Sequence, residues 1–302
     1  MSPIRLVFDM ETRDPDDVLT LCMIATRPGL RLAAVTVNPG TPAQLGVVRT
    51  VLARLGSEVP VGARNTRAEN DAVSPFHRTW LGHTPLAEPD AVAHELLAHA
   101  LTPDAVLLTT APLHNLRLLL RNHPETAVGS WVAQGGFAGD NLVAPADRLP
   151  KFAGLTTTES FNFGHDVKGA FAALTSDRVH SRRLVSKNIT HGVAWDRTFH
   201  ERVLSIEEPA PGVRLAAEAM ELYLREHPDG KLLHDPLAAA AVLKPTAFTW
   251  AEVEVYREQG RWGARPAEGT GTLITVSVDA PRALAALFEP QRSTPLRDGE
   301  TR

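Results

Sequence analysis

The sequence of 302 residues predicts an α/β fold, a doubly wound and mostly parallel sheet with helices on both faces. Short apolar runs alternate with segments of helical periodicity along most of the chain, as expected for parallel strands joined by crossover helices. The first run, IRLVFD at residues 4–9, is apolar up to its final aspartate, which is typical of a strand buried on both faces. We find no internal repeat and no linker, so residues 1–290 are expected to form one domain and residues 291–302 a disordered tail.

The expected elements follow one another in a regular order. Apolar residues at helical spacing predict a helix over 14–26, with Asp14 as the N-cap and Pro15 at the first helical position. A late hairpin is expected from residues 248–258 and 270–279, and two polar segments, 64–89 and 137–165, interrupt the rhythm as long loops. The remaining strands are expected at 30–38, 59–63, 105–111 and 130–136, and the remaining helices at 42–56, 90–101, 112–124, 166–176, 212–227, 235–243 and 281–289.

The composition is that of an ordinary globular protein. Hydrophobic residues make up 43% and charged residues 22%, and the net charge of −4 without a basic stripe argues against a nucleic-acid partner. The one cysteine, Cys22, excludes a disulfide framework and is expected in the core. No signal peptide and no apolar run near ~18 residues is evident, so we expect a cytoplasmic protein without a membrane partner.

Five acids crowd the segment FDMETRDPDDVLTL at residues 8–21, where the first strand ends. In such a sheet, ligands bind outside the carboxyl ends of the strands. Carboxylates held together cannot all ionise without a cation or a shared proton, and oxygen ligands suit Ca²⁺ or Mg²⁺. The alternative, that acids favour the first turn of a helix through its dipole, explains Asp14 and one more acid but leaves Asp9 and Glu11 unexplained.

The acidic segment at residues 8–21 resembles the first motif of the inosine/uridine-preferring nucleoside hydrolases, and the chain is identified as a divergent member of that family. That family's first strand ends in a D-x-D-P-G-x-D-D signature before an apolar helix. Further similar segments follow in the family's order over residues 4–290: LAAVTVNPG, VPVGA, LLTTAPLHNL, AQGG with GDN, ESFN and LLHDPLAAAAVL. The resemblance implies a nucleoside hydrolase-like domain with a Rossmann-like core.

The resemblance also implies roles for individual residues. It implies Ca²⁺ as cofactor and His234 beside the leaving base. The metal ligands it implies are Asp9, Asp14, Asp17, the carbonyl of Thr110, and Asp235. The substrate-binding residues are Asp16, Asn38, His77, Asn141, Glu159, Asn162 and Tyr223, of which His77 and Tyr223 would face the base.

The sequence departs from the family most clearly in its first motif, which is one residue longer. The base that activates water is Glu11 if the insertion lies after it, or Asp14 if the loop is re-threaded; the short loop shared with Asp17 favours Asp14. The gap from Asn141 to Glu159 is longer than is usual in the family, which makes an unusual or 5′-modified sugar conceivable.

We therefore expect a Ca²⁺-dependent hydrolase that cleaves the N-glycosidic bond of a ribonucleoside or modified nucleoside with metal-activated water, and a homodimer or homotetramer. One alternative is a non-catalytic binder of nucleosides or sugars on the same fold. The other is a phosphatase of the haloacid-dehalogenase type, because DMET approaches the D-x-D-x-T motif, although Glu11 replaces the second acid and no late acidic pair is present.

Overall fold

The computed structural model describes residues 2–70 and 72–289, so the predicted tail at 291–302 lies outside the described residues. An 11-stranded sheet runs through the described part of the chain in the order β4-β3-β2-β1-β5-β6-β8-β13-β11-β12-β7. Neighbours from β4 to β13 are parallel, and β11, β12 and β7 are added antiparallel. The strands are β1 (Ile4–Met10), β2 (Leu30–Val37), β3 (Val61–Ala63), β4 (Ala91–Val92), β5 (Val106–Thr109), β6 (Val128–Gln134), β7 (Thr157–Thr158), β8 (Val179–Val185), β11 (Phe248–Glu258), β12 (Arg261–Pro266) and β13 (Thr272–Val278).

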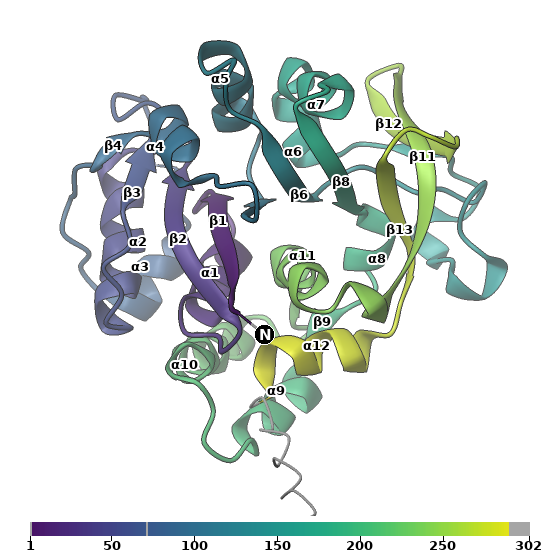
Figure 1. The fold of residues 1–302 in the computed structure, drawn as a ribbon. Helices are drawn as coiled ribbons and strands as arrows, with labels where there is room; N and C mark the ends of the chain where they lie inside the picture. The colour runs from purple at the N-terminus through teal and green to yellow at the C-terminus, as the bar shows by residue number, and fades with distance from the viewer. Residues whose placement is uncertain (1, 71, 290–302) are drawn as a thin grey trace, which may run out of the picture.

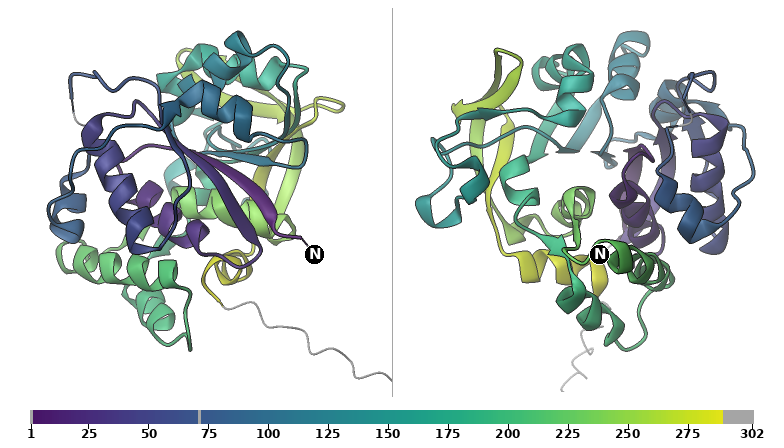
Figure 2. Two further views of the ribbon diagram at one scale, coloured as in Figure 1. Left: turned by 60° about the vertical axis from the view of Figure 1, so that its left-hand side comes forward. Right: turned by 180° about the vertical axis from the view of Figure 1, so that it is seen from behind.

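Helices cover both faces of the sheet, which confirms the doubly wound prediction (Figure 1). One core joins the sheet to α1, α2, α10, α11 and α12, and a second joins it to α4, α5 and α7; Figure 2 shows the two layers from other sides. The helices are α1 (Pro15–Ala25), α2 (Pro42–Arg54), α3 (Pro75–Leu81), α4 (Ala93–Ala100), α5 (His114–Asn122), α6 (Phe161–His165), α7 (Val167–Thr175), α8 (Lys187–Thr190), α9 (Arg197–Leu204), α10 (Pro211–Glu226), α11 (His234–Leu243) and α12 (Ala280–Phe288).

The start of α1 follows the sequence rules for a helix N-terminus. Asp14 is the N-cap in extended conformation and accepts from the backbone N–H of Asp16, and Pro15 opens the helix. Cys22 is completely buried, as predicted. This cap fixes where the helix begins and thereby where Asp16 and Asp17 point.

The late strands are more elaborate than a simple hairpin. β11 and β13 pair antiparallel as predicted, but β12 lies between them in sequence and pairs with the other edge of β11. β13 in turn pairs parallel with β8, a strand that the apolar pattern misses because Arg182 and Arg183 interrupt it. Arg182 donates through Nε to the carbonyl of Ala173 at 3.1 Å, which lets a charged side chain sit in a buried strand.

Helix α11 lies in the middle of the structure. Its four consecutive alanines, Ala238–Ala241, are all completely buried, and small side chains allow close packing against β5, β6, β8 and α1. The first residues of α11, His234 and Asp235, lie next to the start of α1, because their backbone N–H groups donate to Asp16.

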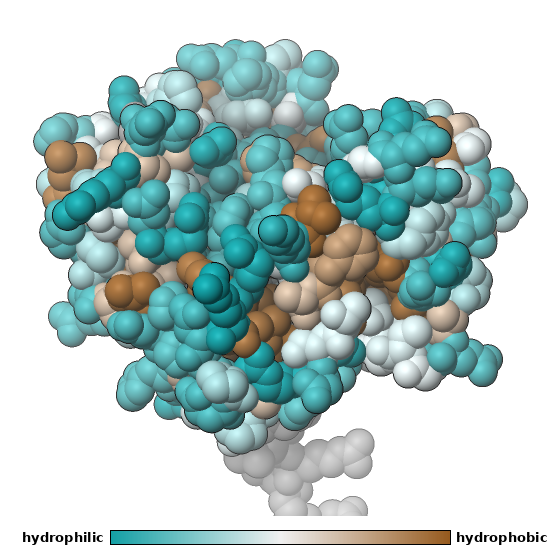
Figure 3. Space-filling model, turned by 90° about the horizontal axis from the view of Figure 1, so that it is seen from above, coloured by the Kyte–Doolittle hydropathy of each residue, from teal (hydrophilic) through white to brown (hydrophobic). Residues whose placement is uncertain are grey.

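No helix in the described residues is both long and apolar enough to cross a membrane. The face seen from above carries mostly hydrophilic residues, with a smaller hydrophobic group near its middle (Figure 3).

Candidate functional site

A pocket of about 400 Å³ opens at the carboxyl edge of the parallel sheet, where the sequence predicts a ligand site. It is formed by the segments that follow β1, β5, β6 and β8 and by the starts of α6 and α11. The lining residues are Glu11, Arg13, Asp14, Asp16, Asp17, Thr110, Gln134, Gly136, Ser160, Phe161, Asn162, Lys187, His191, His234 and Asp235.

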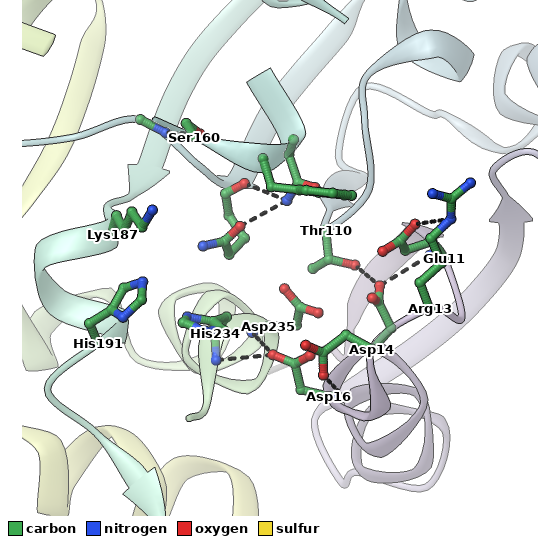
Figure 4. A pocket seen from close by; sticks show the side chains of 15 residues that line it. Glu11, Arg13, Asp14, Asp16, Thr110, Ser160, Lys187, His191, His234 and Asp235 are labelled. Atoms are coloured by element: carbon green, nitrogen blue, oxygen red, sulfur yellow. Dashed lines mark hydrogen bonds and ion pairs between the residues drawn. The ribbon is translucent and has the colours of Figure 1, made fainter. Parts of the chain in front are cut away.

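Three buried carboxylates, those of Asp16, Asp17 and Asp235, converge in this pocket. One oxygen from each lies within 4.8 Å of the others, an arrangement that could hold a metal ion. Figure 4 shows Asp16 and Asp235 close to each other. Asp17 accepts from the Thr110 hydroxyl at 2.7 Å and from the backbone N–H of Glu11 at 3.1 Å. These bonds fix the orientation of the carboxylate while leaving oxygen lone pairs for a cation.

The start of α11 orients the second carboxylate. Asp16 accepts through Oδ2 from the backbone N–H groups of His234 and Asp235, at 3.2 and 3.3 Å. Two acids from α1 thus meet one acid from α11, although more than two hundred residues separate them in the chain.

The three carboxylates of Asp16, Asp17 and Asp235 need a positive charge nearby in order to ionise together. Burial raises the pKa of Asp16 to about 7, against the effect of a nearby lysine. Burial, followed by repulsion from neighbouring carboxylates, raises the pKa of Asp17 and of Asp235 well above the usual range. A cluster that resists ionisation in this way fits a divalent cation, which would stabilise all three ionised forms.

Lys231 is the charged partner that the sequence analysis missed. Its buried ammonium lies 2.8 Å from Asp14 Oδ1 and 3.4 Å from Asp16 Oδ1. Burial lowers the pKa of Lys231, but the negative charges of Asp16 and Asp14 raise it by more than burial lowers it. The pKa therefore lies above its usual value, and the ammonium stays charged. Lys231 belongs to the short strand β10 (Lys231–Leu232), which pairs with β9 (Ala194–Trp195). A lysine directly before the LLHDP segment was the available signal.

The two candidates for the general base therefore differ in their surroundings. Burial raises the pKa of Asp14, but the Lys231 ammonium and hydrogen bonds hold it below its usual value overall. Glu11 lines the pocket with its side chain nearly buried, and its Oε2 lies 3.8 Å from Nε of Arg13. Burial raises the pKa of Glu11 to about 7, against the opposing field of Arg13.

Asp9 lies outside the pocket and braces the sheet. Its Oδ1 accepts from the Thr36 hydroxyl at 2.6 Å and from the Asn115 amide at 2.7 Å. Burial raises its pKa to about 6. This carboxylate ties β1 to β2 and α5, and it is not in the group of acids that could hold a metal.

Two histidines stand side by side on another part of the wall. The rings of His234 and His191 are 4.7 Å apart, and His234 Nδ1 lies 2.8 Å from the Thr190 hydroxyl. Burial, together with neighbouring lysines, lowers the pKa of His234 to about 3 and that of His191 to about 4. Both rings are neutral near pH 7.

Among the residues expected to bind substrate, the structure brings Asp16 and Asn162 to the pocket. Asn162 donates to the carbonyl and side-chain oxygens of Gln134, at 3.0 and 2.8 Å. Asn141 does not line the pocket and donates to the carbonyl of Ala264 instead, and the exposed Glu159 side chain does not line it either.

The three residues expected near the base or the second strand also lie outside the pocket. Asn38 donates to the carbonyl of Pro112, and His77 is buried in α3. Tyr223 packs edge-on against Phe76 at 5.2 Å, so α3 and α10 hold each other. The pocket residues that sequence reasoning did not assign to a site are Arg13, Gln134, Gly136, Ser160, Phe161, Lys187 and His191.

Comparison with known proteins agrees with this geometry. The sequence model described as "Inosine-uridine preferring nucleoside hydrolase" matches residues 6–285. An uncharacterized protein of Aquifex aeolicus is 29% identical, covering 92% of this chain and 96% of the relative. The pyrimidine-specific ribonucleoside hydrolase RihA of Salmonella newport is 27% identical, covering 86% of each chain.

Solved structures share the fold. The plant nucleoside hydrolase PpNRh1 superposes with a TM-score of 0.69 at 21% identity, covering 94% of this chain and 98% of that one. The inosine-uridine preferring nucleoside hydrolase of Bacillus anthracis gives a TM-score of 0.67 at 19% identity, with 95% and 98% covered. With a family match over nearly its whole length and an acid-lined pocket at the expected edge of the sheet, the chain belongs to the inosine-uridine preferring nucleoside hydrolases, enzymes that cleave the N-glycosidic bond of ribonucleosides.

Proposed function

We propose that the protein hydrolyses ribonucleosides or modified nucleosides to base and ribose in a reaction that depends on Ca²⁺. The observation that carries this proposal is the convergence of Asp16, Asp17 and Asp235 in an open pocket. Their oxygen ligands suit a hard divalent cation, and no cysteine or histidine joins them within the described residues. Asp17, Asp235 and the carbonyl of Thr110 would hold the ion. Asp16 would both contact the ion and accept a hydrogen bond from a ribose hydroxyl.

When bound, Ca²⁺ would supply a fixed positive charge that stabilises anionic oxygens in the pocket. Cleavage of the glycosidic bond passes through an oxocarbenium-like state and needs a base that removes a proton from water. We assign this base to Glu11, whose carboxylate lines the pocket. Asp14 is held at the helix N-cap and in the ion pair with Lys231, so accepting a proton there would break existing contacts.

The departing base needs a hydrogen-bond partner on the other side of the sugar. His234 lines the pocket and is oriented by the Thr190 hydroxyl. We propose that His234 hydrogen-bonds the departing base and that Asn162 binds a ribose hydroxyl. Asn38, His77, Asn141 and Tyr223, which do not line the pocket, would then contribute to packing around it, and the exposed Glu159 side chain would have no contact with the substrate.

The proposed roles are tested by comparing Glu11→Gln with Asp14→Asn in a reducing-sugar assay with Ca²⁺. We expect Glu11→Gln to lower kcat by about 10²–10⁴-fold, the usual contribution of general-base catalysis, and Asp14→Asn to stay within about tenfold of the parent. Unfolding curves confirm that both variants fold. A loss in Asp14→Asn as large as that in Glu11→Gln would overturn the assignment, and no ribose from any nucleoside would favour the non-catalytic binder.

The phosphatase alternative finds no support in the pocket. Its nucleophile would be Asp9, which is completely buried and absent from the pocket wall. A cytoplasmic homodimer or homotetramer stays a prediction, and light scattering of the purified protein measures the oligomeric state.

A further inference from the structure

The pocket has walls of opposite charge (Figure 4). Glu11, Asp14 and Asp16 stand on one side, and Lys187 and His191 stand on the other. In the proposed function, the acidic wall binds the cation and the sugar hydroxyls. The proposed hydrolysis gives no role to the residues of the opposite wall.

Lys187 is a cation without an ion-pair partner. Its Nζ donates to the backbone carbonyl of Glu159 at 3.1 Å, and it forms no salt bridge with a carboxylate in the described part of the chain. Burial, and then the nearby charge of Lys151, lowers its pKa, while the exposed Glu159 side chain acts in the opposite direction. A charge that is half-buried without a counter-ion costs free energy that an anionic ligand would recover.

The neighbouring groups on this wall are also donors. His191 Nδ1 lies 2.8 Å from the Lys151 ammonium and must accept from it, so its Nε2 carries the proton. The Ser160 Oγ accepts from the backbone N–H of Gly136 at 3.3 Å, and its hydroxyl hydrogen meets no acceptor among the described residues. Lys151 lies in the stretch between Asn141 and Glu159, and Ser160 follows that stretch directly.

We propose that the substrate is an anionic ribonucleoside or a ribonucleoside 5′-phosphate whose negative group binds the wall formed by Lys187, His191 and Ser160. The anion is either a phosphate on the ribose 5′ oxygen or a carboxylate on the base, since both present oxygen acceptors to the same donors. This inference rests on the proposed hydrolase function and narrows its substrate class. The charged groups around the wall are Lys187, Lys151 and the exposed Glu159, a net positive set.

The test compares kcat/KM for uridine, uridine 5′-monophosphate and orotidine in the presence of Ca²⁺. We expect at least a tenfold preference for one anionic substrate over uridine, and we expect Lys187→Met to reduce that preference ratio by at least tenfold. Lys168→Met, an exposed lysine on α7, is the matched control and should keep the ratio. A preference for the phosphate assigns the anion to the sugar, and a preference for orotidine assigns it to the base.

Equal rates for all three substrates, or a ratio that Lys187→Met leaves unchanged, would overturn the inference. If no substrate is cleaved, the proposed function fails, and calorimetry decides the inference separately. Ribose 5-phosphate or orotate should then bind at least tenfold more tightly than ribose or uracil, and Lys187→Met should remove the difference. Equal binding of charged and neutral probes would contradict it.

Discussion

Lys231 neutralises the acidic wall, so replacing it with methionine should destabilise the protein most when no cation is bound. The change keeps the length of the side chain and removes an ammonium that lies 2.8 Å from Asp14 and 3.4 Å from Asp16. Removing one partner of a buried ion pair costs about 3–5 kcal/mol. The Asp14 side chain is 49% exposed and recovers water, so we take the lower end, about 3 kcal/mol.

This free energy converts into a measurable shift. An unfolding entropy of about 2.1 cal/mol/K per residue over 302 residues gives ~0.6 kcal/mol/K, and 3 kcal/mol then lowers Tm by ~5 °C. The assay is thermal unfolding followed by circular dichroism, once in EDTA and once in excess Ca²⁺. The loss should shrink in Ca²⁺, because a more negative site binds the cation more tightly and gains more stability from it.

The matched control is Lys244→Met, an exposed lysine just beyond the far end of α11. It should change the free energy of unfolding by no more than about 0.5 kcal/mol. The reasoning is refuted if Lys231→Met unfolds within 1 °C of the parent in EDTA, for which ~5 °C is expected, or if Ca²⁺ leaves its deficit unchanged.

Three further predictions concern the metal, pH and packing. Asp17→Asn and Asp235→Asn should each weaken Ca²⁺ binding at least tenfold by calorimetry, and EDTA should abolish activity until Ca²⁺ is restored; parental affinity in both variants would contradict the ligand assignment. Burial lowers the pKa of His77 from its usual 6.5 to about 4, so the folded protein resists protonation and loses stability as pH falls from 6.5 towards 4, by about 3 kcal/mol. Denaturant curves over this range should show a shallower loss in His77→Gln, and equal slopes would contradict the prediction. Gly212→Ala should destabilise the fold by about 3 kcal/mol because a methyl group would overlap a backbone carbonyl of α1, whereas Gly164→Ala, which meets open space, should stay within about 1 kcal/mol; chemical unfolding measures both, and equal stabilities would refute the clash.

The parts of the fold that depend on local rules could be predicted from the sequence. The strand at Ile4–Met10 and the cap at Asp14 depend on apolar runs and on the preferences of a few adjacent residues, and both are found where expected. The strand at Val179–Val185 was missed because its two arginines hide the apolar pattern, and bonds to surrounding carbonyls make the burial of Arg182 tolerable.

The acids of the first motif show the same division within the site. The sequence by itself led us to expect Asp17 and Asp235 in one cation site together with Asp9 and Asp14, and Asp16 in binding a ribose hydroxyl. Only the fold groups Asp16 with Asp17 and Asp235 and leaves Asp9 and Asp14 outside that group. The surroundings of Asp14 and Glu11 could not be predicted from the sequence, because Lys231 contacts Asp14 only when β10 packs beside the start of α1. Likewise, Lys187 and His191, which lie in and directly after α8, face the acids only because the segment that follows β8 packs beside the start of α1 and α11 in one pocket. Caps and apolar periods act between near neighbours, but ion pairs and pocket walls join distant segments. Tertiary packing alone therefore decided that Asp14 pairs with Lys231, while the side chain of Glu11 lies beside Arg13 in the pocket.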